Sequence, residues 1–308
     1  MADKRFKHRL EYVFLKTVQF VANALPAAWA VAFGTPLGAL AYALWARRRN
    51  IALANLRFCF PDADERWVRR VARRSFENVA KTLIDYMRLG KLNADNIGRY
   101  HAVRNQKCYD DAHAWGRGAV VFTGHFGSWE QTGAGVRLRG YAIHYLVGEQ
   151  TNRLVDDEMN RLRAGAGIGI IHMGAAAKGV FKVLRANGMV ALLSDQDAGP
   201  DGVRVKFFGH DASTPKGPAA FVAKTGATVC AGFTVRDSNT HNTLIMEDAY
   251  VEEATDDLEA DIARITQRYT SLLEKYIRAY PDQYYWMHRR FKTTHPEIYS
   301  AASGKTAA

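Results

Sequence analysis

The stretch Val120–Glu130, VVFTGHFGSWE, joins an apolar run to a histidine that has glycines close on both sides. The run Val120–Phe122 is typical of a buried strand, and Gly124 and Gly127 favour a turn around His125. A strand followed by a glycine turn is by itself more often structural than functional. The segments on either side therefore decide whether His125 belongs to a site.

The segments around this stretch alternate between strand-like and helix-like patterns. Strand-like runs at 119–122, 142–147, 168–172 and 189–193 are separated by helical runs at 131–138, 154–163 and 175–186. Further helices are expected at 62–89, 219–224 and 258–277, and further strands at 227–235 and 243–250. The alternation predicts an α/β fold with a mostly parallel or mixed sheet flanked by helices. His125 then follows the carboxyl end of a parallel strand, where open sheets place their ligands.

The composition restricts the partners. Of the 308 residues, 48% are hydrophobic, which is ample for a folded core, and 42 Lys and Arg outnumber 31 Asp and Glu to give a net charge of +11. Such a charge favours an anionic partner, namely nucleic acid, phospholipid, a phosphorylated substrate or an acidic protein. No common nucleic-acid-binding pattern is visible. The three dispersed cysteines fit neither a disulfide framework nor a zinc ribbon, which favours a reducing compartment.

The amino-terminal segment, residues 1–50, has the pattern of a membrane-association segment. Thr17–Ala46 contains no charged residue and is bounded by basic clusters. Basic residues beside an apolar segment favour anionic lipid at the cytoplasmic leaflet. The segment is interrupted by polar residues, glycine and proline, so spanning and surface-lying arrangements both stay open, as does a buried hairpin of a soluble protein. The polar tail 301–308 is expected to be disordered.

His125 and Glu130 suggest acid–base chemistry. They can meet if His125 lies on the turn and Glu130 on the first turn of the following helix. A carboxylate bonded to one ring nitrogen fixes the tautomer and makes the other nitrogen a general base for an alcohol. A thioester acyl donor then needs no serine or cysteine nucleophile. Ser128 lies outside a G-x-S-x-G motif and is interpreted as a turn or cap residue.

A metal-dependent reaction is the alternative. His125 and Glu130 lack the spacing of an H-E-x-x-H zinc motif, so no metal is expected there. Asp195 and Asp197 follow a strand and could bind a divalent cation, as a D-x-D pair does in nucleotide-sugar transferases. An EF-hand is excluded because Lys206 stands where the loop needs its last ligand.

Five blocks in order, GHFGSWE, LLSDQDAG, KFFG, STPKGP and YYWMHRRFK, resemble the lauroyl/myristoyl acyltransferase family of lipid A biosynthesis, which shares an H-x4-E motif. The resemblance runs from about Arg47 to Lys292. It implies an acyltransferase domain over 51–300, similar in design to glycerol-phosphate acyltransferases and working without a cofactor. It also implies transfer of an acyl chain from acyl carrier protein to a hydroxyl of an anionic lipid, at the cytoplasmic face of the inner membrane.

The resemblance also assigns roles to residues. It implies His125 as the base, Glu130 as its partner, Arg161 as an aid to the reacting centre, with Arg163 two residues away, and Asp197 as a residue that orders the neighbouring loop. Ser128 stands where family members commonly have Asn, a departure that leaves the base and its partner untouched. The family includes enzymes that acylate mannosylated phosphatidylinositol, so the acceptor stays open.

Two basic clusters each have a structural and a functional interpretation. The His288–Arg290 run is either a solvated edge or, as its aromatic neighbours favour, an anion site for phosphate or phosphopantetheine, with Arg289 binding substrate. The arginines within 66–74 form a solvated face or a dock for acidic acyl carrier protein. A basic adaptor without enzymatic activity would also fit the net charge, but it has no use for the GHFGSWE turn.

Overall fold

The computed structural model describes residues 2–300, with side chains from Arg5 onward; the tail 301–308 lies outside the described residues. The α-helices are α1 Ala2–Ala24, α2 Ala27–Ala32, α3 Gly34–Leu44, α4 Ala46–Cys59, α5 Glu65–Met87, α6 Ile97–Tyr100, α7 Lys107–Ala114, α8 Trp129–Arg137, α9 Arg153–Gly165, α10 Ala176–Arg185, α11 Gly217–Thr225 and α12 Leu258–Ala279. The strands are β1 His101–Arg104, β2 Ala119–Thr123, β3 Ile143–Val147, β4 Gly169–His172, β5 Met189–Leu193, β6 Val203–Phe207, β7 His210–Thr214, β8 Thr228–Arg236 and β9 Asn242–Met246.

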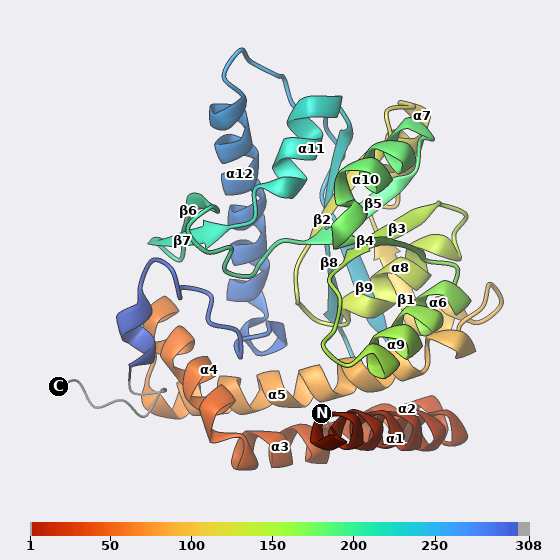
Figure 1. Ribbon diagram of the computed structural model, residues 1–308, viewed down its shortest axis with the longest axis vertical. Helices are drawn as coiled ribbons and strands as arrows, with labels where there is room; N and C mark the ends of the chain where they lie inside the picture. Colours follow the sequence, from red (N-terminus) through yellow and green to blue (C-terminus); the bar gives the residue numbers. More distant parts are fainter. Residues whose placement is uncertain (1, 301–308) are drawn as a thin grey trace.

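Within residues 2–300 the main sheet has seven strands in the order β1-β9-β8-β2-β5-β3-β4. All neighbours are parallel except β8 and β9, so the sheet is mixed and mostly parallel. Helices cover both faces (Figure 1). The α/β fold expected from the sequence is therefore confirmed. Strand β1 and the separate hairpin β6-β7 were not expected.

Strand β2 lies in the middle of the sheet and is buried on both faces. Ala119 and Val121 belong to one apolar cluster, whereas Val120 and Phe122 belong to the other. The ring of Phe122 packs against that of Tyr269 on α12, with 5.0 Å between centroids. Full burial of such a side chain contributes about 1.5–3 kcal/mol, which explains why the sequence here is continuously apolar. This central strand carries His125 just beyond its carboxyl end.

The amino-terminal helices α1–α3 lie alongside α5 (Figure 1). Helix α3 approaches α5 so closely that a Cβ atom on Gly38 would stand 2.3 Å from the Cα atom of Glu77. Helix α1 is tied to the domain by an ion pair between Lys16 and Glu158 at 3.0 Å. These helices are therefore fastened along one side of the domain.

Helices α1–α3 also carry large apolar side chains that are exposed. We call this set the apolar face; it consists of Phe6, Leu10, Val13, Phe14, Phe20, Trp29, Phe33, Leu40 and Leu44. The stretch Ala27–Leu44 is long and apolar enough to cross a membrane by length and composition, although it is divided between α2 and α3. Only 22% of this stretch is buried, unlike the buried hairpin that a soluble protein would have.

Helix α5 connects these amino-terminal helices to the carboxyl edge of the sheet. Asp64 caps its first turn by accepting a hydrogen bond from the Trp67 amide at 2.6 Å. Its buried polar residues Asn78, Thr82 and Asp85 face the segment that follows β2. Exposed arginines lie on its other sides. The helix therefore lies against both the amino-terminal helices and the turn that carries His125.

Candidate active site

The His125 ring is held by a carboxylate from the neighbouring strand. Strands β2 and β5 pair in parallel with Thr123 opposite Leu193, and His125 and Asp195 each lie two residues further on. Asp195 accepts the His125 amide at 3.0 Å and the ring Nδ1 at 2.8 Å. Because an ionised carboxylate can only accept, Nδ1 carries the proton and Nε2 keeps a free lone pair. The arrangement supplies a base at Nε2.

Electrostatics adjust both members of this pair. Burial lowers the pKa of His125, but the charge and hydrogen bond of Asp195, together with the charge of Glu130, outweigh it and raise that pKa above its ordinary value. Burial raises the pKa of Asp195, whereas the charge and hydrogen bonds of His125 lower it below its ordinary value. Asp195 therefore stays ionised, and His125 binds a proton more readily than a free histidine.

The turn that carries His125 requires glycine at position 127. Gly127 has a φ of 56°, and a Cβ atom there would lie 1.6 Å from the carbonyl oxygen of Thr234. The Gly127 amide donates to the carbonyl of Gln283 at 2.8 Å, and the Tyr285 amide donates to the carbonyl of His125 at 3.0 Å. The turn is therefore enclosed by β8 and by the segment after α12.

Glu130 does not bond to His125, contrary to the expectation from the sequence. Its carboxylate accepts two hydrogen bonds from Arg163 on α9, from Nε at 3.1 Å and from Nη2 at 2.7 Å. The side chains are 9% and 12% exposed, so the pair is nearly buried. Asp195 already occupies Nδ1, and Glu130 on the first turn of α8 meets α9 instead. Its effect on the His125 ring is through charge alone.

A cavity of about 470 Å³ opens beside the His125 ring. Trp129, Leu146, Val147, Met173, Leu193 and Pro215 form an apolar part of its lining. Glu130, Gln150, Arg163, Gln196 and Asp197 supply polar groups. A cavity with both kinds of lining next to a base can hold an apolar chain and a hydroxyl-bearing group together.

The structure brings Asp197 to this cavity but not Arg161. Asp197 accepts hydrogen bonds from the amide and hydroxyl of Thr293 and from the amide of Gly199, so it fastens the loop that follows β5. Arg161 pairs with Glu158 on its own helix, and its side chain is 62% exposed. The arginine at the cavity wall is Arg163.

The His288–Arg290 run is mostly engaged inside the protein. Burial lowers the pKa of His288 to about 4, and its neutral ring accepts the Asp197 amide at 2.9 Å. Arg290 is buried and donates to the Ser213 carbonyl and the Thr214 hydroxyl. Arg289 lies over the ring of Tyr299, 5.7 Å from its centroid, outside the cavity lining. His288 and Arg290 are therefore engaged within the protein, and the role of Arg289 in binding substrate stays a prediction.

The two carboxylates of the D-x-D pair have different partners. Asp195 accepts from His125, whereas Asp197 accepts from Thr293 and Gly199. Within the part of the chain that the structure describes, no group of three or more His, Cys, Asp or Glu side chains is arranged as a metal site. The two carboxylates therefore make separate contacts within the protein.

The two arginines of α9 can be separated by matched substitutions. We expect Arg163→Gln to lower the free energy of unfolding by about 3–5 kcal/mol, because it leaves the buried Glu130 carboxylate without its partner. We expect it to reduce activity as well. Arg161→Gln removes an exposed pair and should cost less than about 1 kcal/mol. Thermal melts and initial rates compare the two variants, and an equal loss in both would contradict the assignment of Arg163 to the cavity.

Sequence reasoning missed two site residues, Asp195 as the partner of His125 and Arg163 as the partner of Glu130. The signal for Asp195 was its place directly after a strand, which the sequence interpretation used only for the metal alternative. No local pattern distinguished Arg163 from Arg161, since the difference depends on which face of α9 meets α8. Both omissions concern contacts between segments far apart in the chain.

Known acyltransferases resemble this chain over most of its length. A family model described as bacterial lipid A biosynthesis acyltransferase matches residues 2–293. The lipid A biosynthesis lauroyltransferase of Escherichia coli is 29% identical over 268 residues, which cover 84% of each chain. A phosphatidylinositol mannoside acyltransferase of Mycobacterium tuberculosis is 25% identical over 223 residues, covering 69% of this chain and 67% of that protein.

Among solved structures, the 1-acyl-sn-glycerophosphate (LPA) acyltransferase of Thermotoga maritima aligns with a TM-score of 0.35 and 12% identity. The alignment covers 86% of this chain and 98% of that chain.

Proposed function

Because the chain belongs to the bacterial lipid A biosynthesis acyltransferase family, we propose that it moves an acyl chain from a thioester on acyl carrier protein to a glycolipid hydroxyl, with His125 as general base. The observation that carries this proposal is the hydrogen bond from Nδ1 of His125 to Asp195, which leaves Nε2 free at the wall of a cavity. The family membership makes the chain an acyltransferase; the donor, the acceptor and the base are the proposed parts.

In the proposed reaction, Nε2 of His125 takes the proton of the acceptor hydroxyl as its oxygen attacks the thioester carbonyl. The tetrahedral intermediate then collapses, the carbon–sulfur bond breaks, and the imidazolium returns its proton to the leaving thiolate. Asp195 holds the ring in one tautomer and stabilises its charged form. The products are the acylated lipid and the free thiol of the carrier, and no covalent acyl-enzyme is formed.

Two further residues support the site in this proposal. Glu130 raises the pKa of His125 through its charge and keeps Arg163 at the cavity wall. Asp197 fixes the loop that borders the cavity. The apolar lining accommodates the acyl chain, for which each buried methylene contributes about 0.8 kcal/mol.

Lipid analysis tests the function and identifies the acceptor. Mass spectrometry of lipid extracts from cells with and without the gene should show one glycolipid that lacks a single acyl chain when the gene is absent. A lipid A precursor is the acceptor that the family suggests, and a mannosylated phosphatidylinositol is the second candidate because a relative named for that activity also matches. Identical lipid profiles in both strains would contradict the proposal.

The apolar face is the proposed contact with the cytoplasmic leaflet of the inner membrane. Phe14, Phe20 and Trp29 are 68%, 75% and 73% exposed, which is unusual for large apolar side chains in contact with water. Basic residues in α1 and at the start of α4 flank this face and would meet anionic headgroups. Because α1–α3 are fastened to the domain, the face would lie along the membrane.

Substitutions in the apolar face should release the protein from membranes. In the triple variant Phe14→Asp, Phe20→Asp, Trp29→Asp, each lost side chain removes about 1.5–3 kcal/mol of burial in lipid. Sedimentation with phosphatidylglycerol-containing vesicles measures the bound fraction, which should fall strongly. Trp115→Asp is the control because Trp115 is also exposed and directly follows α7, a helix that lies away from α1–α3 (Figure 1). Equal binding of the triple variant and the control would contradict the membrane assignment.

The exposed arginines of α5 are the proposed dock for acyl carrier protein. Electrostatic attraction between these arginines and an acidic carrier should accelerate association. Dissolved salt screens this attraction over about 8 Å at physiological ionic strength. Among the residues that the structure describes, Arg69 and Arg73 pair with Glu65 and Glu77 on the same helix, at 2.8 and 3.0 Å, so they remain available at the surface.

Charge reversal tests this dock. In the variant Arg69→Glu, Arg70→Glu, Arg73→Glu, the rate of transfer from acyl carrier protein should fall and should no longer depend on salt concentration. The rate of transfer from a small acyl thioester in detergent should change little. The matched control reverses the exposed Lys178, Lys182 and Arg185 of α10. Rates with both donors are compared for each variant. An equal loss of transfer rate with the two donors would contradict the docking proposal.

A further inference from the structure

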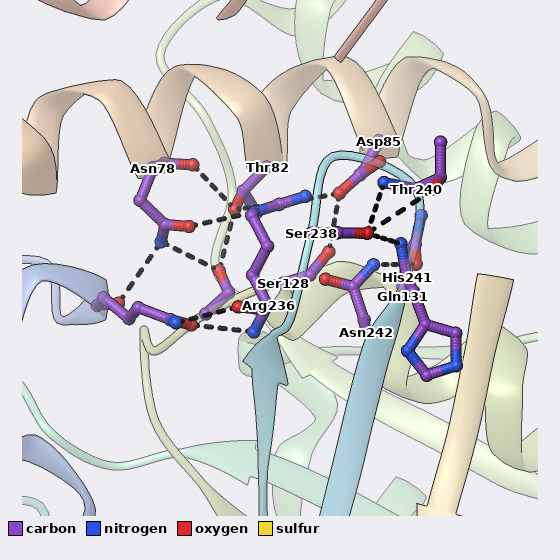
Figure 2. Close-up of polar contacts among 12 residues, drawn as sticks. Asn78, Thr82, Asp85, Ser128, Gln131, Arg236, Ser238, Thr240, His241 and Asn242 are labelled. Carbon is purple, nitrogen blue, oxygen red and sulfur yellow. Dashed lines mark hydrogen bonds and ion pairs between the residues drawn. The ribbon is translucent and has the colours of Figure 1, made fainter. Parts of the chain in front are cut away.

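Arg236 is a buried arginine outside the lining of the catalytic cavity, at the end of β8. Figure 2 shows its guanidinium directed at α5. Its Nε donates to Oδ1 of Asn78 at 3.0 Å, and its Nη2 donates to the Thr82 hydroxyl at 3.1 Å. Nη2 also pairs with Oδ2 of Asp85 at 2.7 Å, and both side chains of this ion pair are 6% exposed. One guanidinium therefore organises three side chains on successive turns of α5.

The same three side chains hold the turn that carries His125. Thr82 donates to the carbonyl of Gly127 at 2.7 Å, and Asn78 donates to that carbonyl at 3.3 Å. Asp85 accepts the hydroxyl of Ser128 at 3.0 Å. Gly127 and Ser128 follow His125 by two and three residues. The contacts from α5 therefore act on the backbone next to the proposed base.

The backbone of Arg236 is fixed to the same turn from the other side. Gln283 accepts the Arg236 amide with its side-chain oxygen at 2.8 Å and donates to the Arg236 carbonyl at 3.0 Å. The carbonyl of Gln283 accepts the Gly127 amide at 2.8 Å. Both polar groups of the Gly127 backbone are thus bonded to residues that Arg236 holds.

We propose that Arg236 is a positioning residue for acyl transfer, which fixes the turn through Asn78, Thr82 and Asp85 and thereby aligns His125 with Asp195 and the cavity. This inference rests on the proposed role of His125 as the base. The planar guanidinium is suited to the task because it donates in several fixed directions at once, which a lysine ammonium does not do in the same geometry. Misplacement of a reacting group by about 1 Å can cost up to about 100-fold in rate.

The test uses the full-length protein and the variants Arg236→Gln and Arg236→Lys. For Arg236→Gln we expect kcat to fall by about 10- to 100-fold while KM changes by less than about 3-fold, because the cavity lining is unaltered. Arg236→Lys keeps the charge opposite Asp85 and should lose less. Arg264→Gln on α12 is the control, since Arg264 makes partly exposed ion pairs on a different helix.

A second measurement does not depend on turnover. The Nδ1 proton of His125, held by Asp195, should give a downfield proton resonance. In folded Arg236→Gln this resonance should shift or broaden, whereas in Arg264→Gln it should match the wild type. A loss of activity that only follows the fraction of unfolded protein, with the resonance unchanged, would show that Arg236 is merely structural and would overturn the inference.

Asp85→Asn tests the same inference if Arg236→Gln does not fold. The amide retains an oxygen for Ser128 and Arg236 but removes the charge, so we expect kcat to fall by about 3- to 10-fold with the same displaced resonance. An unchanged kcat and an unchanged resonance in Asp85→Asn would reject the inference. Wild-type protein without acyl transfer would instead refute the proposed function, and the resonance of His125 would still report whether Arg236 aligns the ring.

Discussion

His125→Ala will lower acyl transfer by about 10²- to 10⁴-fold, the usual contribution of a general base, while the protein stays folded. The substitution removes Nε2, the only nitrogen of this ring that the hydrogen bond to Asp195 leaves free. The ring is partly exposed, lies on a turn and belongs to neither apolar cluster, so its removal leaves the packing of the core in place. Initial rates with a thioester donor, together with circular dichroism and thermal melts, measure the two effects separately.

The stability of this variant should depend on pH. The pKa of His125 is raised in the folded protein, so the ring contributes stability that is fully present below its unfolded pKa and is lost as pH rises through its folded pKa. Replacement by alanine should therefore destabilise the protein mainly at acidic pH. The exposed His113 of α7 provides the control as His113→Ala, which should leave the rate unchanged. A folded His125→Ala protein with a rate within a few-fold of wild type would end the proposed mechanism.

Asp195→Asn should reduce activity by about 10³- to 10⁴-fold, as loss of the orienting carboxylate does in a serine protease triad. The amide can donate to Nδ1 and so favour the tautomer that protonates Nε2, which abolishes the base. Loss of the negative charge also lowers the pKa of His125. Because the neutral ring is the active form, the acidic limb of the residual activity should move to lower pH. The measurement is kcat/KM as a function of pH.

Glu130→Gln distinguishes the two carboxylates near the ring. Glu130 raises the pKa of His125 by charge without a hydrogen bond, so its removal should move the acidic limb less and leave the tautomer unchanged. The plateau rate should accordingly fall less than in Asp195→Asn. A larger loss in Glu130→Gln would mean that Glu130 becomes the partner of His125 during catalysis, contrary to the geometry.

The sequence predicted the central part of the fold because its strands are buried on both faces. The apolar runs at β2 and β5 and the intervening helical runs have patterns that solvent-exposed segments do not share. Strand β1 was missed because it is short, and the hairpin β6-β7 because both of its strands are short and β7 is mostly polar in sequence. In β1 and β6-β7, pairing with a neighbouring strand rather than local composition determines the structure.

The sequence predicted those features of the site that lie within one segment of the chain, but not the contacts between distant segments. His125 follows from one strand and one turn, whereas its bond to Asp195 joins residues 70 positions apart. The chain forms β3 and β4 before β5, which pairs with β2 in the sheet. No spacing in the sequence predicts that β2 and β5 are neighbours. The five-residue spacing from His125 to Glu130 was compatible with a contact, but the competing contact with Arg163 depends on how α8 packs against α9.

The proposed membrane contact of the apolar face has a kinetic consequence. An enzyme that rests on the bilayer containing its acceptor meets that acceptor by lateral diffusion, so the relevant concentration is a mole fraction in the surface and not an amount per volume. Dilution of the acceptor with inert lipid at constant bulk concentration should then slow the enzyme, whereas dilution of the whole suspension should scarcely change the rate per bound molecule. The length of α1–α3 along the membrane would set how many lipids a bound enzyme contacts at one time.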